Sequence, residues 1–265
     1  MAINFAEQLA DLSNRGFNAE QARTIVLISR AAAILFQDFP DAFVVFGGAT
    51  LVLFHDSVRH SNDLDLLSKN EALPSSEAII ESLKRGLQAP VEALNLGTLE
   101  YSIKDGSQPE LKIFVANAVG SRLFQIDFTR IGSVIASEIE DHPIEIDGNI
   151  PSQVQSVSKE FLLLQKGETF LQRRVIKARD AYDIHYLFNL GAKLSEVLHG
   201  HLEDSLSGSE SGPDEIRERI GQLTFKLCQK ELQPLLPPGI FERLEKEEFR
   251  PLRDAVATLY EDWLQ

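Results

Sequence analysis

The stretch FGGATLVLFHDSVRHSNDLDLLSKNE, residues 46–71, decides how the first half of the chain folds. Two glycines separate the apolar run AFVVF from a segment with helical spacing, and the alternating segment NDLDLLS follows. Successive side chains of a strand point to opposite faces of the sheet, so Asp63 and Asp65 share one face and their leucine neighbours share the other. The stretch therefore predicts a strand, a helix and a second strand that presents two carboxylates.

Two carboxylates this close raise each other's pKa, and a divalent cation relieves the repulsion between them. Mg²⁺ prefers hard oxygen ligands, namely one or two carboxylates together with nucleotide phosphates. For a lone D-x-D pattern, a half-exposed strand with two solvated aspartates is the ordinary alternative. The residues just before the pair favour the metal site, because they suit a phosphate.

Gly47 and Gly48 stand where a strand ends and a helix begins, so backbone N–H groups and the helix N-terminus can face a phosphate. Arg59 and Ser61 add a cationic donor and a hydroxyl ahead of the aspartates. Phosphate ligands and metal ligands thus follow one another within about twenty residues.

A third carboxylate would complete a site in which two metal ions clamp the attacking and leaving oxygens of an in-line displacement. Asp127 interrupts the apolar strand pattern LFQIDFTR and is the predicted third ligand, with Glu145 as the weaker substitute. An aspartate on the polar face of an edge strand is the ordinary alternative. We expect two Mg²⁺ ions bound by Asp63, Asp65 and Asp127, with a nucleoside triphosphate as substrate.

Hydrophobic periodicity predicts the organisation of the whole chain. Residues 6–38 show helical spacing in two pieces, and the pattern SSEAIIESLKRGL predicts a helix ending near Gly86. Strand patterns follow between residues 96 and 146, and turn-forming residues between the first three indicate an antiparallel meander. After Pro151 the strands are expected to stop. The predicted class is α+β, with a mixed-sheet domain at 1–151 and an all-helical domain at 152–265.

Composition limits the class of protein. The chain carries 26 Lys and Arg against 40 Asp and Glu, a formal net charge of −14. This charge argues against extensive electrostatic binding of a nucleic-acid backbone, although it is compatible with a local basic groove. The single cysteine, Cys228, excludes an internal disulfide framework. The N-terminus has the pattern of an amphipathic helix, and the apolar runs are too short to span a membrane, so we expect a cytoplasmic protein with no membrane partner.

Two separated motifs resemble one known family. The pattern GG, L, then R-x-S-x-DLDLLS is similar to the signature of the AbiEii/AbiGii toxin family, within the DNA polymerase β-like nucleotidyltransferase superfamily. The segment KEFLLLQKGETFLQRRVIKARDAYDIHYLF, residues 159–188, resembles the family's pattern of a lysine on one helix and R…K-x-RD-x-YDL on the next. The resemblance covers residues 42–68 and 152–188. It implies a nucleotidyltransferase-like sheet domain followed by a helical domain that completes an active-site cleft.

The resemblance also implies roles for residues of the first motif. Asp63 and Asp65 correspond to the family's metal ligands. Gly47, Gly48 and Ser61 correspond to its phosphate contacts. Where the family often has a threonine this chain has an alanine followed by Thr50, so which residue supplies a hydroxyl stays open.

In the second motif, the resemblance assigns Lys166 to neutralising phosphoryl charge and Asp180 with Asp183 to holding the site together. The residues themselves suggest alternatives. A buried lysine is rare unless it is paired, so Lys166 is expected to be functional or salt-bridged, with an exposed lysine as the alternative. Asp180 could instead favour the dipole at the start of its helix.

Four basic residues stand within seven positions of this acidic chain, namely Arg173, Arg174, Lys177 and Arg179. Such a patch could receive a triphosphate or an RNA end, and we assign Lys177 to the nucleotide. Pairing with neighbouring acids, three or four residues away, is the alternative.

The predicted reaction moves a nucleoside monophosphate from a nucleoside triphosphate to an acceptor hydroxyl and releases pyrophosphate. The resemblance implies the toxin of a bacterial toxin–antitoxin pair, with an antitoxin as partner and a tRNA 3′ end or another cellular target as acceptor. A small-molecule nucleotidyltransferase of the antibiotic-modifying kind is the first alternative, favoured by the negative charge. A non-catalytic partner-binding module is the second, and the presence of all three carboxylates disfavours it.

Overall fold

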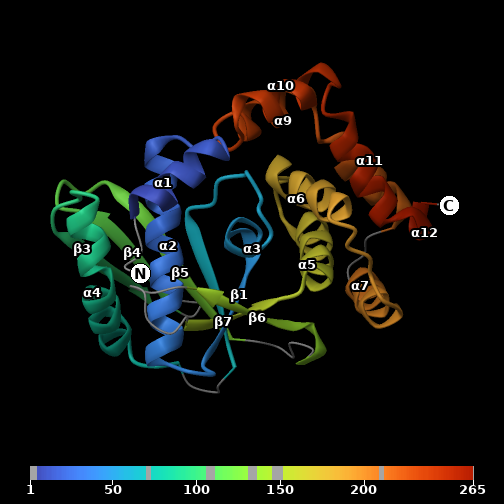
Figure 1. Cartoon of the computed structure of the whole chain (residues 1–265). Coiled ribbons are helices and arrows are strands. Elements are labelled where there is room, and N and C mark those ends of the chain that lie inside the picture. Colours follow the sequence, from blue (N-terminus) through green and yellow to red (C-terminus); the bar gives the residue numbers. More distant parts are fainter. Residues whose placement is uncertain are drawn as a thin grey trace. The chain divides into compact units, whose positions relative to one another are not determined.

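The computed structural model describes residues 5–69, 73–105, 111–130, 136–144, 152–208 and 212–264. The chain divides into two compact units, Met1–Val157 and Ser158–Gln265. The first unit contains a mixed sheet with helices, and the described part of the second is helical, so the predicted α+β class is confirmed (Figure 1).

Among the described residues, seven strands form one sheet in the order β3-β4-β5-β2-β1-β7-β6. They are β1 Phe43–Phe46, β2 Asp63–Ser68, β3 Leu99–Asp105, β4 Leu111–Asn117, β5 Arg122–Arg130, β6 Ile139–Ile144 and β7 Ser152–Val157. The strands β3, β4 and β5 pair antiparallel, which confirms the predicted meander. The strand β2 pairs parallel with β5 and antiparallel with β1. The meander and the strand pair β1–β2 are therefore parts of one continuous sheet.

The expectation that strands stop at Pro151 is wrong, because one more strand follows it. Residues 152–157 form β7, which pairs parallel with β1 through Val45 and Ser156 and antiparallel with β6. The pattern SQVQSV alternates weakly, and its pairing with β1 is what makes it a strand. The boundary between the two units consequently lies at Val157.

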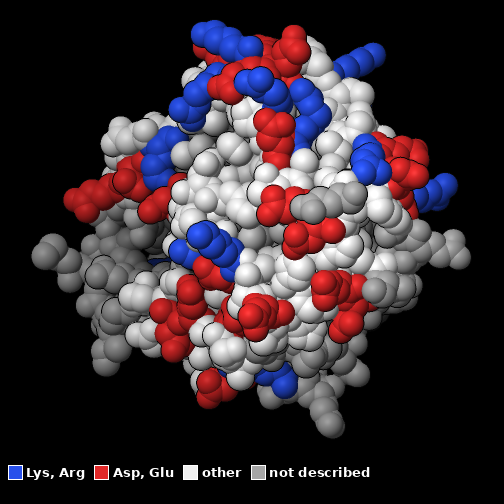
Figure 2. All heavy atoms as spheres, turned by 90° about the vertical axis from the view of Figure 1, so that its right-hand side faces the viewer, with Lys and Arg blue, Asp and Glu red and all other residues white. Residues whose placement is uncertain are grey.

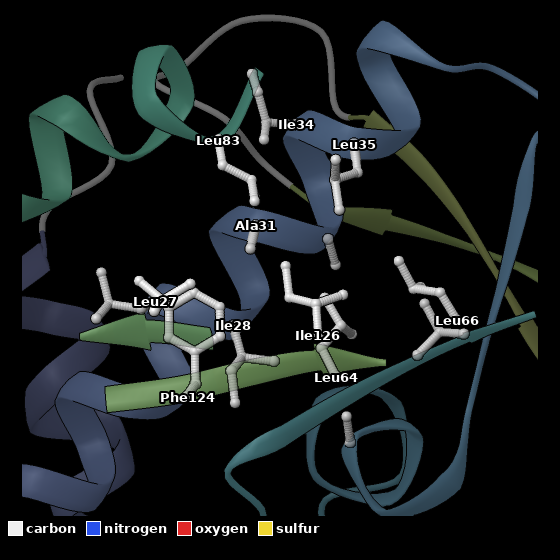
Figure 3. Packing of buried hydrophobic residues seen from close by; sticks show 14 of the residues in the cluster. Leu27, Ile28, Ala31, Ile34, Leu35, Leu64, Leu66, Leu83, Phe124 and Ile126 are labelled. Atoms are coloured by element: carbon white, nitrogen blue, oxygen red, sulfur yellow. The ribbon is translucent and has the colours of Figure 1, made fainter. Parts of the chain in front are cut away.

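Helix α2, Ala19–Asp38, is the centre of the first unit's core. It begins with a capping box in which the side chains of Asn18 and Gln21 bind each other's backbone N–H groups. Figure 3 shows its apolar side chains packed against those of β2 and β5. Leu64, Leu66 and Ile126 are fully buried there, as the strand alternation predicts. The other helices of this unit are α1 Phe5–Asn14, α3 Gly47–Phe54 and α4 Ser76–Ala93.

Helix α4 continues through Gly86, where the sequence pattern predicts its end. A Cβ atom at Gly86 would overlap Ile34 of α2, 2.8 Å from its Cβ and 2.9 Å from its Cγ2. The glycine thus permits the close approach of two helices and is not a helix stop. The helix ends seven residues later at Ala93.

The described part of the second unit holds α5 Lys159–Gln172, α6 Ala178–Asn189, α7 Glu196–Gly208, α8 Pro213–Gly221, α9 Phe225–Leu232, α10 Pro238–Lys246, α11 Arg250–Leu259 and α12 Glu261–Leu264. Later segments hold α5 in place. The buried Tyr260 hydroxyl donates to the carbonyl oxygen of Gly167 at 2.7 Å, and Arg219 donates to the carbonyls of Phe170 and Arg173. None of the helices in the described ranges combines the length and apolar character of a transmembrane segment.

Replacing Gly86 with alanine should destabilise the protein, because the added Cβ forces α4 away from α2 at a cost of about 1–3 kcal/mol. Gly200 is the matched control, since it also lies inside a helix and nothing outside that helix stands within 4 Å of the place a Cβ would take. Gly200→Ala should leave stability unchanged or raise it by about 0.5–1 kcal/mol. Urea unfolding monitored by circular dichroism measures both; equal effects would contradict the close-approach explanation.

Candidate active site

The two aspartates of β2 and the aspartate of β5 are neighbours on one sheet face. Asp63 and Asp65 are half-buried and alternate with fully buried leucines. Because β5 runs parallel to β2, Asp127 stands directly opposite Asp65 in the register, and Gln125 stands opposite Asp63. Adjacent strands lie about 4.8 Å apart, so the predicted third carboxylate is brought beside the pair.

Asp127 has one occupied and one open oxygen. The Lys112 ammonium lies 2.7 Å from Oδ2, and the Gln125 amide lies 3.3 Å from the same atom. The other oxygen, Oδ1, is buried and has no hydrogen-bond partner among the described residues. Lys112 is opposite Asp127 on β4, so it compensates the charge of that carboxylate. No local sequence pattern indicates Lys112, because the register between β4 and β5 is what places it beside Asp127.

The donor chemistry of this face suits a divalent cation, since carboxylate oxygens are what Mg²⁺ prefers and Oδ1 of Asp127 is an unfilled acceptor. In the described part of the chain, however, no three His, Cys, Asp or Glu side chains converge as a formed metal site. The arrangement is three neighbouring carboxylates with an ammonium beside one of them. Glu145, the weaker substitute for the third ligand, lies outside the described residues.

The glycine pair lies against the same carboxylates. Gly47 adopts a left-handed φ of 72°, and a Cβ atom there would overlap Oδ2 of Asp65. A Cβ at Gly48 would lie 2.6 Å from Nη2 of Arg59 and 2.9 Å from Oγ of Ser61. The first turn of α3 is thus surrounded by the acid, the guanidinium and the hydroxyl that the sequence singled out, and its backbone N–H groups suit an anion.

Two further residues of this region are enclosed. Arg59 is 3% exposed and donates through Nη1 to the His60 carbonyl at 3.1 Å. Thr50 has no exposed surface, and its hydroxyl has no hydrogen-bond partner within the described ranges. The Thr50 hydroxyl is therefore packed inside the first unit, whereas Ser61 is half-buried.

The second motif forms a buried ion-pair cluster. The Lys166 ammonium of α5 lies 2.7 Å from Asp183 and 3.7 Å from Asp180, which are one turn apart on α6. Arg173 approaches Asp180 from the other side, at 3.0 Å. Both carboxylates are fully buried, so each needs its cation. Lys166 is the salt-bridged lysine that its sequence context predicts, and its exposed alternative is excluded.

Pairing with acids accounts for two of the four basic residues. Lys177 forms a 3.1 Å ion pair with Glu231 of α9, whose second oxygen accepts from the N–H of Ala178 at the start of α6. Arg173 is held by Asp180, as described above. Arg174 and Arg179 form no ion pair with any described residue. A role of Lys177 in nucleotide binding stays a prediction, because its observed contact anchors a helix.

The chain matches a family model described as "Nucleotidyl transferase AbiEii toxin, Type IV TA system" over residues 31–258. Two solved structures share the fold. A candidate nucleotidyltransferase from Helicobacter pylori has 12% identity and a TM-score of 0.53, with 93% of this chain and 97% of that chain covered. JHP933 from Helicobacter pylori has 13% identity and a TM-score of 0.51, with 93% and 94% covered. A comparison with curated proteins gave no match.

The sheet, the glycine turn and the D-x-D strand, together with this match, define a nucleotidyltransferase. The match extends through most of both units, and the chain belongs to the AbiEii toxin family.

Removing Asp183 alone should be strongly destabilising, because the Lys166 ammonium is left without its closest partner in a buried site. We expect Asp183→Leu to cost about 3–5 kcal/mol. The double variant with Lys166→Met should recover most of this loss, since it leaves no unpaired charge. A double-mutant cycle by urea unfolding measures the coupling, and strictly additive losses would show that the two side chains are independent.

Stability should fall in acid partly through His60. Burial and the neighbouring Arg59 guanidinium lower the pKa of His60 from 6.5 to about 4. The folded protein then binds fewer protons than the unfolded chain, so the stabilisation is present above pH 6.5 and is lost as the pH falls toward 4. The loss is on the order of 3 kcal/mol.

His60→Asn should remove this component and flatten the stability profile between these two pH values. Urea unfolding of both proteins across the pH range measures the difference. Parallel profiles would mean that the His60 ring does not titrate as its surroundings require.

Proposed function

We propose that the protein transfers a nucleoside monophosphate from a nucleoside triphosphate to the hydroxyl of a cellular acceptor, as the toxin of a bacterial toxin–antitoxin pair. The observation that carries the proposal is the close packing of Gly47 and Gly48 against Asp65, Arg59 and Ser61. This packing puts backbone N–H groups, a guanidinium and a hydroxyl beside a carboxylate, which is the set of groups that a metal-bound triphosphate requires.

Each group has a defined part in the reaction. The first-turn N–H groups of α3, with Arg59 and Ser61, bind the triphosphate oxygens and orient the α-phosphorus. The acceptor oxygen forms a bond to that phosphorus, the bond to the bridging oxygen breaks, and pyrophosphate leaves. Asp127 takes the acceptor's proton on Oδ1, which is buried and has no hydrogen bond from a described residue.

Asp63, Asp65 and Asp127 would hold two Mg²⁺ ions, which would neutralise phosphate charge and lower the pKa of the acceptor hydroxyl. The Lys112 ammonium lies 2.7 Å from Oδ2 of Asp127 and compensates the charge on that oxygen. The family-derived roles of Lys166, Lys177, Asp180 and Asp183 stay predictions.

The proposed setting is the bacterial cytoplasm, where triphosphates and tRNA are abundant and an antitoxin would be made beside the toxin. A tRNA 3′ end is the proposed acceptor. A small molecule is the second candidate, and the net charge of −14 is the observation that favours it.

Incubating the protein with Mg²⁺, α-labelled nucleoside triphosphates and total tRNA should label RNA and release pyrophosphate. Asp65→Asn should lower the rate by on the order of 10²–10³, because it removes a charge where the triphosphate binds. Asp56→Asn is the matched control, since Asp56 has a side chain 95% exposed in the same unit. Thermal unfolding of each variant checks the fold.

Two outcomes would contradict the proposal. Undiminished transfer by Asp65→Asn would show that the Asp65 carboxylate is not needed for the reaction. Absence of pyrophosphate release by the unaltered protein with RNA and with small-molecule acceptors would count against catalysis itself.

A further inference from the structure

The carboxylate face of the sheet continues across β5 onto two more strands. Register partners lie on the same face, and two rows of side chains therefore run from β2 to β3. One row is Asp65, Asp127, Lys112 and Lys104; the other is Asp63, Gln125, Phe114 and Ser102. The charge changes sign along the first row, from two acids to two lysines. The opposite face of β4 and β5 is apolar and buried in the core.

Phe114 and Arg122 form the most distinctive contact of this surface. The Arg122 guanidinium lies over the Phe114 ring, 4.2 Å from its centre, and Arg122 Nη1 donates to Gln125 at 3.2 Å. Gln125 in turn donates to Asp127. Phe114 is half-buried although it lies on the polar face, and Arg122 is exposed. A chain of contacts therefore links an aromatic ring and a guanidinium to the third carboxylate.

These groups match one kind of acceptor. A guanidinium plane held over an aromatic ring offers a stacking surface to a nucleobase, and the other cations offer contacts to phosphates. Lys104 is exposed on β3 and Arg122 on β5, with Glu100 as the acid on the same face of β3. A polycationic small molecule would instead meet repulsion from Lys104, Lys112 and Arg122. Figure 2, which draws one side of the molecule, shows acidic side chains spread widely over that side with basic ones mixed among them, in keeping with the net charge of −14.

We propose that Phe114, Arg122 and Lys104 bind the unpaired end of a nucleic-acid strand, whose terminal hydroxyl then lies at the carboxylates. This assignment rests on the proposed function for its chemistry and on the sheet register for its geometry. The last base stacks at Phe114 and Arg122, and the phosphate before it contacts Lys104. Gln125 joins the stacking pair to Asp127, so strand binding and the catalytic carboxylate are coupled.

The test measures strand binding apart from transfer. Fluorescence anisotropy follows a 5′-labelled short oligoribonucleotide with Mg²⁺ and no triphosphate, and the DNA of the same sequence is a second arm that separates RNA from DNA. Phe114→Leu keeps apolar area and loses the ring, so affinity should fall roughly 5- to 100-fold, as for one lost stacking contact. Phe114→Trp should restore it.

Arg122→Gln and Lys104→Gln should each weaken binding and lower the slope of log affinity against log salt by about 1. Arg23→Gln is the matched control, because Arg23 is an exposed arginine on α2, the helix that covers the opposite face. It changes the net charge equally and should leave affinity within about twofold, since surface charges away from the strand act weakly. Triphosphate binding by the variants at Phe114, Arg122 and Lys104 should equal that of the unaltered protein.

Equal affinities of Phe114→Leu, Arg122→Gln and the unaltered protein would overturn the assignment, and so would equal losses in Arg23→Gln. Preference for a polycationic small-molecule acceptor over both oligonucleotides would overturn it as well. Loss of strand affinity in these variants supports the surface even if no transfer is found, in which case only the proposed function fails. If Phe114→Leu transferred nucleotides to RNA as fast as the unaltered protein, the proposed function would be supported and the strand-binding role of this surface would be contradicted.

Discussion

The alternation of leucines and aspartates along β2 is the constraint on which the candidate site depends. Leu64 and Leu66 are fully buried under α2, and burying each such side chain contributes about 1.5–3 kcal/mol. A shift of the strand by one residue would expose both leucines and place the aspartates in the core. The hydrophobic core thus sets the direction in which the carboxylates point, and the site inherits the rigidity of the sheet.

Charge balance is handled differently in the two units. On the sheet, Lys112 compensates one oxygen of Asp127 and leaves the other without a donor among the described residues, so the face keeps capacity for a cation or a proton. In the helical unit, Lys166 and Arg173 match Asp180 and Asp183 charge for charge inside the protein. A balanced buried cluster of this kind is costly to break at any one member. The same residue types therefore provide reactivity in one place and rigidity in the other.

Local patterns predict the parts of this fold that depend on neighbours in sequence. The strand–helix–strand unit around Gly47, the meander and the paired state of Lys166 all follow from periodicity or residue type. The contact between Asp65 and Asp127 depends on parallel pairing of strands 62 positions apart in sequence, which no local pattern encodes. For the same reason β7, Lys112 and the Phe114–Arg122 contact could not be predicted. Gly86 misleads because its signal is the same for a helix end as for a close helix crossing.

The hydrogen bond from Tyr260 to the carbonyl of Gly167 has a consequence for biosynthesis. The two residues are 93 positions apart, and Gly167 directly follows Lys166. Chains are made from the N-terminus, so α5 leaves the ribosome long before the segment that holds it in place. A nascent chain can complete its sheet and carboxylates early, yet the lysine cluster gains its full support only when translation has passed Tyr260. For a protein of a toxin family, this order means that the hydrogen bond supporting the lysine cluster forms only after residue 260 has been synthesised.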